Sequence, residues 1–480
     1  MDHDASTAGW NFDNTYSHLP ERFFSRLKPT SVLAPAIALF NDELAAELGL
    51  SAEALKLEAA QVLSGKSIPA GAEPLAQAYA GHQFGHPNML GDGRAVLLGE
   101  HVTPSGVRYD IQLKGSGPTP YSRRGDGRAT LSAMLREYLI SEAMHGLKIP
   151  TTRSLAVITT GERVRRETTL PGAVLTRVAS SHIRVGTFEF AAATGELELL
   201  RALADYTIDR HYPEAKSQPQ PYLALLNAVI ERQASLISKW MLVGFIHGVM
   251  NTDNMALSGE TIDYGPCAFM DTYAVGTVFS SIDENGRYAF GNQPPIAEWN
   301  LTRFAETILP LLDSQTEVAI EKAQDALKNF AAHFGTYFIN GMRAKLGLTG
   351  DNEEDIALIT TLLTWMEKQK VDYTKTFRSL SDGSIANNSV FQDAEFVEWQ
   401  KSWQSRAPSQ ELMRANNPAV IARNHKVEEA LAAAVERGDY EPAKRLLAAL
   451  KNPFESSSEK AEYLDPAPGG NESYQTFCGT

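Results

Sequence analysis

The stretch 247–271, HGVMNTDNMALSGETIDYGPCAFMD, constrains the fold of this chain more than any other part of its sequence. An Asp-Asn pair, Asp253 and Asn254, ends nine residues before an Asp-Tyr-Gly triplet that begins at Asp263. A magnesium-nucleotide site needs a carboxylate beside the acceptor, a neutral oxygen ligand next to it and a second carboxylate for the metal. The stretch therefore predicts a fold that brings these groups together in one cleft.

The segment between the pair and the triplet, 255–262, is a short run of apolar and polar residues with a central Ser-Gly. This pattern predicts a tight hairpin that joins the two ends. In protein kinases the base is an aspartate five residues before the metal-binding asparagine, and that position is Val249 here. Asp253 is available instead as a general base, a role that contributes about 10²–10⁴-fold to a rate. The alternative is a loop aspartate that caps a turn.

The elements expected upstream of this stretch alternate between strand and helix. Residues 95–98 and 107–113 have strand patterns, and the second alternates strictly with period two. Apolar spacing predicts a helix over 129–146, further strands over 153–178 and a mainly helical chain from 195 onward. Strands, one helix, strands and a helical half follow one another as in a two-lobed kinase-like domain, so the predicted fold class is α+β.

Shifts in pattern and composition along the chain predict five regions. These are an N-terminal extension wrapping the core at 1–75, an N-lobe-like part with nucleotide-binding loops at 76–190, a C-lobe-like helical half with the catalytic and metal-binding loops at 191–330, a C-terminal helical region at 331–452, and a flexible tail with Cys478 at 453–480.

A lysine and a glutamate upstream match the ion pair that holds ATP phosphates in kinases. Lys114 ends the strand predicted over 107–113, and Glu137 lies on the following helix. Glu142, on the same helix, is the alternative partner. Taken alone, the two residues also fit a surface lysine and a solvated helix face, but together with Asp253, Asn254 and Asp263 the ion pair is favoured.

Glycine-rich turns and arginines supply candidate phosphate contacts. The pentapeptide GDGRA occurs at 91–95 and again at 125–129, and backbone N–H groups of such turns can cradle phosphates beside an arginine. Arg177 and Arg184 follow the later strands, where phosphate contact and ordinary surface charge are equally good interpretations. The chain has no Gly-Lys-Ser/Thr P-loop, which excludes that class of nucleotide-binding protein.

Composition narrows the function classes further. A formal net charge of −14 argues against broad nucleic-acid binding. Two cysteines cannot form a disulfide framework, so a reducing compartment is expected. No signal-peptide pattern opens the chain and no uninterrupted run of 18 apolar residues exists, which predicts a soluble, cytoplasmic protein that needs no membrane.

Several long motifs occur in order over essentially the whole chain. They are AGHQFGHPNMLGDGRA, QLKGSGPTPYSRRGDGRATL, LREYLISEAM, VLTRVASSHIRVGTFEF, HGVMNTDNM and IDYGPCAFMD. On these motifs the chain resembles the selenoprotein O family, pseudokinase-fold proteins that act as protein adenylyltransferases. The resemblance implies transfer of AMP from ATP to Ser, Thr or Tyr hydroxyls of partner proteins, with Mg²⁺ or Mn²⁺ as the metal and the nucleotide in a flipped orientation.

The resemblance also assigns roles to particular residues. It implies that Asp253 is the proton acceptor and that Asn254 and Asp263 bind the metal. The ATP site that it implies comprises Gly91, Gly93, Arg94, Lys114, Asp126, Gly127, Glu137, Arg177, Arg184 and Asp263.

Three different activities stay open on the sequence. They are uridylyl transfer from UTP with Mn²⁺, γ-phosphoryl transfer by a kinase, and nucleotide binding by a pseudokinase scaffold. The resemblance further implies that Cys478 pairs with a cysteine after the Asp-Tyr-Gly triplet, but the corresponding stretch 276–281 has none. A regulatory Cys267–Cys478 disulfide is the hypothesis that follows.

Overall fold

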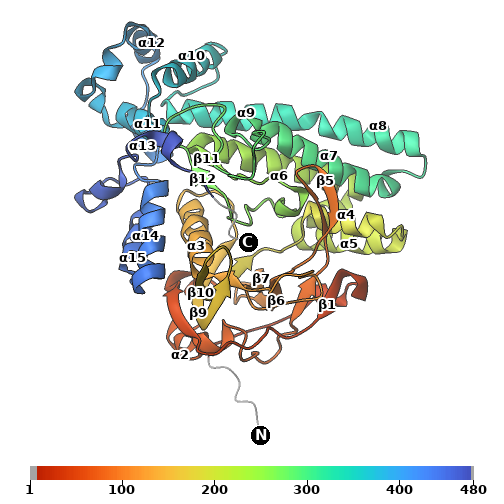
Figure 1. Ribbon diagram of the computed structural model, residues 1–480. Helices are drawn as coiled ribbons and strands as arrows, with labels where there is room; N and C mark the ends of the chain where they lie inside the picture. The colour runs from red at the N-terminus through yellow and green to blue at the C-terminus, as the bar shows by residue number, and fades with distance from the viewer. Residues whose placement is uncertain (1–7, 477–480) are drawn as a thin grey trace.

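The computed structural model describes residues 8–476, which form a sheet-containing half and a helical half (Figure 1). The main sheet is antiparallel, in the order β1-β3-β6-β7-β10-β9-β2, and β8 pairs with β10. Its strands are β1 Phe24–Arg26, β2 Ala36–Phe40, β3 Leu75–Gln77, β6 Ala95–Val102, β7 Arg108–Lys114, β8 Ala129–Thr130, β9 Arg153–Arg165 and β10 Thr169–Ala179.

The residues before Leu75 form both edges of this sheet. β1 pairs with β3 at one edge and β2 pairs with β9 at the other. Helices α1 (Asp42–Glu47) and α2 (Ala52–Val62) supply apolar side chains to a core beneath the sheet, where they meet Ile111 and Leu113 of β7. The period-two pattern of β7 thus puts its apolar residues in a core and leaves Gln112 and Lys114 for the opposite face.

Helix α3 (Leu131–Gly146) packs against β9 and β10 on one side and against α14 and α15 on the other. It begins at the N-cap Thr130, whose hydroxyl accepts a hydrogen bond from the N–H of Ala133. Its long buried face carries Glu137 toward the sheet. The helix therefore fixes one carboxylate between the sheet and the C-terminal helices.

The remaining helices build the other half of the molecule. Their bounds are α4 Val185–Ala193, α5 Leu197–His211, α6 Pro221–Val243, α7 Gln293–Leu312, α8 Thr316–Leu327, α9 Asn329–Lys345, α10 Glu354–Gln369, α11 Tyr373–Asp382, α12 Ala394–Gln404, α13 Gln410–Asn416, α14 Asn424–Arg437 and α15 Glu441–Lys451. Two short strands, β11 (Phe245–Ile246) and β12 (Ala268–Phe269), pair on either side of the loop that carries Asp253 and Asp263. Among residues 8–476, none of the helices has both the length and the apolar character needed to cross a bilayer.

A separate hairpin links the two halves. Strands β4 (Ala80–Gln83) and β5 (His86–Met89) pair only with each other among the described strands. In Figure 1 the hairpin, in orange, reaches from the sheet to the helices near α4. Its first strand contacts α4 and the 3-10 turn Thr252–Asn254, so it lies directly against the loop that carries Asp253.

The hairpin predicted over 255–262 is wrong. Ala256 pairs with Arg184 and Thr261 pairs with Thr151, so the two halves of the segment bond to different parts of the chain and not to each other. A tight turn does occur, with the Gly259 N–H bonded to the Ala256 carbonyl. Long-range pairing replaced the local hairpin that the apolar-polar run and its central Ser-Gly favoured.

The last described residues pack against the helical half, although their composition favours a mobile tail. The side chain of Asn471 accepts a hydrogen bond from the Asp271 N–H (2.9 Å). Farther on, Thr476 pairs in parallel with Ser280, and its hydroxyl donates to the Pro266 carbonyl (2.8 Å). Residues 471–476 therefore hold the segment that follows the Asp-Tyr-Gly triplet.

Candidate active site

Three buried side chains and one partly exposed carboxylate form an ion cluster at the junction of the sheet, α3 and the Asp-Tyr-Gly loop. Lys114 Nζ lies 2.6 Å from Glu137 Oε2 and 2.7 Å from Asp263 Oδ1. Arg177 bridges the same two carboxylates, at 2.6 Å from Glu137 and 2.5 Å from Asp263. Two cations and two carboxylates thus compensate one another where water is largely excluded.

The charges of this cluster are stable in their ionised forms. Burial by itself would raise the pKa of Asp263, but Arg177 and Lys114 hold it well below its usual value of 3.8. Asp263 also has a left-handed backbone, with φ +63°, and the Gly265 N–H bonds to its carbonyl (2.9 Å). An aspartate tolerates this conformation better than most residues, and it turns the carboxylate toward Lys114.

Arg184 lies at the N-terminus of α4 and faces the same cluster. Its guanidinium donates to the Asp253 carbonyl (3.2 Å) and to Asp263 Oδ2 (3.3 Å). It is also stacked over the ring of Tyr79, 4.4 Å from the centroid. The arginine therefore ties the Asp253 loop to the Asp-Tyr-Gly loop.

These groups surround a cleft of about 500 Å³ between the two halves. Of the residues singled out from the sequence, those that line it are Gly93, Arg94, Lys114, Arg177, Arg184, Asp253, Asn254 and Asp263. Val249, which stands where kinases have their base, lines it too. A phosphate-bearing ligand in this cleft would meet three cations at one end and Asp253 on its wall.

Asp253 has the environment of a general base. The side chain is buried and its Oδ1 has no hydrogen-bond partner among the described residues. Burial raises its pKa to about 7, against the smaller opposing effect of Arg184. A carboxyl group with such a pKa can accept a proton near neutral pH.

The β4–β5 hairpin supplies much of this burial. Gly81 lies so close to Asp253 that an added Cβ would collide with Oδ1 and come within 2.8 Å of Cγ. The neighbouring His82 N–H donates to the Thr252 hydroxyl (2.7 Å), which donates to Glu189 (2.7 Å). Glu189 in turn bonds the ring of His82 (2.6 Å), so the hairpin, the loop and α4 are joined in one closed ring of contacts.

Asn254 and Asp263 offer oxygen ligands suited to Mg²⁺. The Asn254 side-chain N–H₂ donates to the Val249 carbonyl (3.0 Å), which leaves its carbonyl oxygen for another partner. Mg²⁺ is commonly held by one or two protein oxygens together with substrate phosphates and water. The described residues contain no cluster of three or more His, Cys, Asp or Glu side chains that could hold a metal ion.

A second, larger cavity of about 1160 Å³ adjoins the cleft. Arg94, Lys114 and Gly265 line both spaces. The second cavity continues past Glu137 between α3 and α14, and Tyr474–Thr476 close part of its wall. The two spaces therefore adjoin at Arg94, Lys114 and Gly265.

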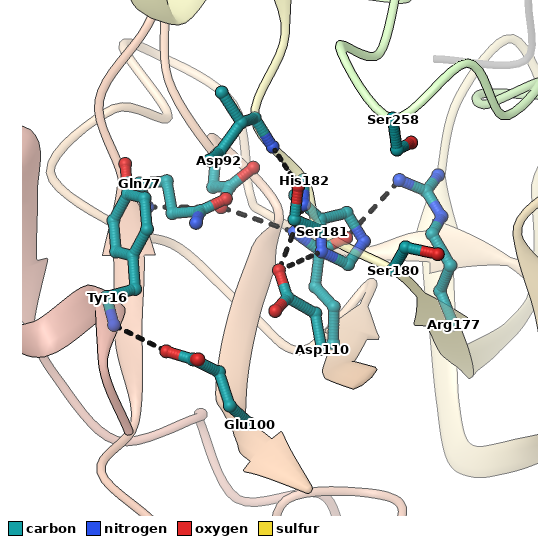
Figure 2. Close-up of polar contacts among 12 residues, drawn as sticks. Tyr16, Gln77, Asp92, Glu100, Asp110, Arg177, Ser180, Ser181, His182 and Ser258 are labelled. Carbon is teal, nitrogen blue, oxygen red and sulfur yellow. Dashed lines mark hydrogen bonds and ion pairs between the residues drawn. The ribbon is translucent and has the colours of Figure 1, made fainter. Parts of the chain in front are cut away.

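A buried polar network beneath the cleft supports the residues between Arg177 and Arg184 (Figure 2). His182 donates from its backbone N–H to Asp110 Oδ2 (2.9 Å), and its ring Nδ1 lies 3.0 Å from the same oxygen. Arg210 bridges Asp110 (2.8 Å) and Glu100 (2.5 Å). These contacts fix the chain that carries both arginines.

Three predicted nucleotide contacts lie elsewhere. Gly91, Asp126 and Gly127 are not among the described residues that line either cavity. Asp126 forms an ion pair with Arg166 (2.9 Å), and Gly127 packs against the backbone of Gly117. Their role as ATP ligands stays a prediction.

Glu142 does not take the place of Glu137 beside Lys114, because its carboxylate is bonded to Arg153 (2.9 Å).

The two cysteines of the proposed regulatory disulfide differ in what the structure describes. Cys267 is fully buried, whereas Cys478 lies outside the described residues. The Cys267–Cys478 disulfide is therefore still a hypothesis.

The sequence reasoning missed Tyr79, Asp92 and Asn251, all of which line the cleft. Asp92 stands between the two glycines of the first GDGR motif and accepts hydrogen bonds from the Gln77 N–H (3.1 Å) and the Gln112 side chain (3.3 Å). Its place in the motif was a usable signal. Tyr79 and Asn251 belong to no motif that suggests a role.

A lysine–glutamate pair beside a cleft that Asp253, Asn254 and Asp263 line is the arrangement of groups that nucleotide-dependent transferases of the kinase-like α+β class use. The chain belongs to the SelO family, since residues 7–451 match the family model described as "Protein adenylyltransferase SelO".

Curated relatives agree with this assignment. The chain is 62% identical to "Protein nucleotidyltransferase YdiU" of Geobacillus kaustophilus, over 98% of this chain and all of the relative. It is 60% identical to the protein of that name from Bacillus cytotoxicus, over 98% of each chain. A Toxoplasma gondii virulence factor with a protein-kinase fold aligns over 68% of this chain and 86% of its own, with 11% identity and a TM-score of 0.23, which is too low to support an argument. The chain is a nucleotidyltransferase.

Proposed function

We propose that this protein transfers AMP from ATP to the hydroxyl of a Ser, Thr or Tyr side chain on a partner protein and releases pyrophosphate. The observation that carries the proposal is Asp253, a buried carboxyl group with a pKa of about 7 on the wall of the cleft that Lys114 and Asp263 line. The family description, protein adenylyltransferase, supports the same reaction.

The reaction balances with the groups in the cleft. The acceptor oxygen attacks the α-phosphorus of ATP, and its proton passes to the Asp253 carboxylate. A new P–O bond joins AMP to the side chain, and the bond between the α-phosphorus and the bridging oxygen breaks. The electron pair leaves with pyrophosphate, whose charge Arg177 and Arg184 can stabilise.

The two adjoining cavities favour an orientation in which the outer phosphates lie at the cationic end of the cleft. Arg177 and Arg184 line only the cleft, whereas Lys114 also lines the second cavity, which offers Met134, Leu431 and Val435 as apolar lining. A triphosphate in the cleft with its nucleoside in the second cavity puts the α-phosphate beside Lys114. This arrangement exposes the inner phosphorus to Asp253.

When bound by Asn254 and Asp263, Mg²⁺ or Mn²⁺ would neutralise phosphate charge and orient the triphosphate. Lys114 would hold the phosphates, while Glu137 and Arg177 hold Lys114 and Asp263 in register. Asp253 would hold the proton. The hairpin over Asp253 would exclude water from the reacting side.

The proposal is tested with ATP labelled on the α- or the γ-phosphate, incubated with the protein, Mg²⁺ and a proteome extract. We expect label on protein only from the α position, and none with Asp253→Asn, which should still bind nucleotide. Label retained only from the γ position would overturn AMP transfer in favour of phosphorylation.

Two further arms separate uridylyl transfer and a scaffold role from AMP transfer. Greater incorporation from α-labelled UTP with Mn²⁺ than from ATP would replace AMP by UMP as the transferred group. ATP binding without product from any label would leave a scaffold. Mass spectrometry of the labelled proteins identifies the modified side chain.

A further inference from the structure

Two arginines lie over the ring of one tryptophan beside the β4–β5 hairpin. The guanidinium of Arg287 lies 4.8 Å from the ring centroid of Trp299, and that of Arg303 lies 5.1 Å from it. The ring of His82 contacts the same indole at 5.5 Å. We call Arg287, Trp299 and Arg303 the Arg–Trp stack; it pre-orients two planar guanidinium groups on one aromatic ring.

The stack adjoins the wall of the cleft that carries Asp253. Tyr288, next to Arg287 in the chain, donates its hydroxyl to the side chain of Asn251 (2.6 Å), two residues before Asp253. Asn251 also accepts from the Phe84 N–H (2.9 Å) at the tip of the hairpin. Phe84 and Asn251 line the cleft, so one short chain of contacts joins Arg287 to the reacting side.

Arg287 has no counter-ion within the described range. Its side chain is partly exposed and forms no ion pair with any described residue. Its Nε is buried, so an anion from another molecule would meet the terminal N–H groups. The nearby Asp283 carboxylate is occupied by the backbone N–H groups of Arg287 and Tyr288, both at 2.8 Å. Arg303, by contrast, is paired with Glu306 (2.6 Å). Arg287 is therefore the member of the stack that can accept a carboxylate from another molecule.

The negative charge of the whole protein makes Arg287, unpaired among the described residues, a distinctive binding position for acidic segments. With a formal net charge of −14, the surface as a whole repels acidic polypeptides, so an acidic partner segment gains affinity where a cation without a counter-ion faces it. We propose that Arg287, held by Trp299, recognises an acidic side chain close in sequence to the acceptor hydroxyl of the partner protein. This inference rests on the proposed transfer to protein hydroxyls and names the class of partner segment.

Binding can be tested separately from catalysis. Fluorescent peptides with a central Ser carry Glu, Gln or Lys at each position from −3 to +3, and anisotropy is measured with a non-hydrolysable ATP analogue and Mg²⁺. We expect Glu at one or two positions to tighten binding about tenfold over Gln. In Arg287→Glu the preference should reverse toward Lys at the same positions, while Arg287→Lys should keep a weaker preference for Glu.

A remote charge reversal serves as the matched control. Arg437, an exposed arginine near the end of α14, replaced by Glu makes the same change in net charge and should leave the peptide preference unchanged. Equal binding of the Glu and Lys peptides by the unmodified protein would overturn the inference. So would the same loss of preference in Arg437→Glu and Arg287→Glu.

Transfer assays on the same peptides distinguish the two proposals. If Glu peptides bind selectively through Arg287 but none receives label from α-labelled ATP, AMP transfer fails and the recognition site stands. If peptides are labelled without regard to flanking charge, the recognition site fails and AMP transfer stands.

Discussion

At the scale of single residues, the buried carboxyl of Asp253 sets the expected pH dependence of the reaction. Burial raises its pKa to about 7, and only the ionised form can accept the proton. We therefore expect the transfer rate with saturating nucleotide to rise about tenfold per pH unit below 7 and to level off above it. A stopped assay from pH 5.5 to 8.5 measures this profile, and a flat profile would contradict the role of Asp253.

The same residue links stability to pH. Because the folded-state pKa lies above the unfolded value of 3.8, the stabilisation from protonated Asp253 is complete below pH 3.8 and is lost as the pH rises through 7. Asp253→Asn should therefore raise the free energy of unfolding by up to about 4 kcal/mol at pH 8 and by less at pH 5. Urea unfolding of both proteins at both pH values measures this change in the free energy of unfolding. Asp325→Asn, which changes an exposed aspartate of α8, should show no such gain.

Arg177 should matter more for stability than its single charge suggests. It is 2% exposed and bridges Glu137 and Asp263, so Arg177→Met leaves the buried Glu137 with Lys114 alone and removes one of the three cations around Asp263. We expect a loss of about 3–5 kcal/mol in the free energy of unfolding, measured by urea at pH 7. Arg22→Met, which removes an exposed pair with Glu196, should cost at most about 1 kcal/mol. Similar losses in both variants would refute this account of the cluster.

The residues that could be recognised from the sequence are those whose chemistry has a fixed spacing. Lys114 at a strand end and the Asp-Asn…Asp pattern are of this kind, and the structure brings all of them to one cleft. The two GDGR motifs show where recognition from local sequence fails. Asp92 of the first motif faces the cleft, whereas Asp126 of the second pairs with Arg166. Identical local sequences have different roles because the surrounding chain decides what each aspartate meets.

At the scale of elements, the tight packing of the β4–β5 hairpin on the Asp253 loop gives a sharp prediction. Gly81→Ala puts a methyl group against the Asp253 carboxyl, so the loop must shift. We expect the transfer rate to fall at least about tenfold while nucleotide affinity changes little, since a small misplacement of a reacting group is costly. Rates and nucleotide titrations measure the two effects.

The matched control is Gly335→Ala on α9, where an added Cβ meets nothing within 4 Å. It should leave the rate unchanged and raise stability by about 0.5–1 kcal/mol, because glycine is unfavourable inside a helix. Equal rates for Gly81→Ala and the unmodified protein would show that the hairpin does not position Asp253.

Strand and helix order was predictable because it depends on local periodicity, as in β7 and α3. The edge strands β1 and β2 are only three and five residues long, too short to give a pattern. The segment 255–262 was mispredicted for a related reason. The Leu257 N–H bonds to the Ile183 carbonyl, a distant partner that no local pattern reveals.

At the scale of the whole molecule, residues 471–476 connect the C-terminal end to the loop after Asp263. Asn471 holds the N–H groups of Asp271 and Thr272, and Thr476 pairs beside Phe279. A chain ending at Pro468 should therefore lose hydrogen-exchange protection at residues 271–281 and bind nucleotide more weakly. A chain ending at Thr476 retains these contacts and is the control. Unchanged exchange in the shorter chain would contradict this dependence.

The position of Tyr474–Thr476 in the wall of the second cavity makes that compartment depend on residues more than 200 positions beyond the Asp-Tyr-Gly triplet. Loss of these residues, for example by proteolysis, would open one side of the cavity while leaving every residue from Lys114 to Asp263 in place.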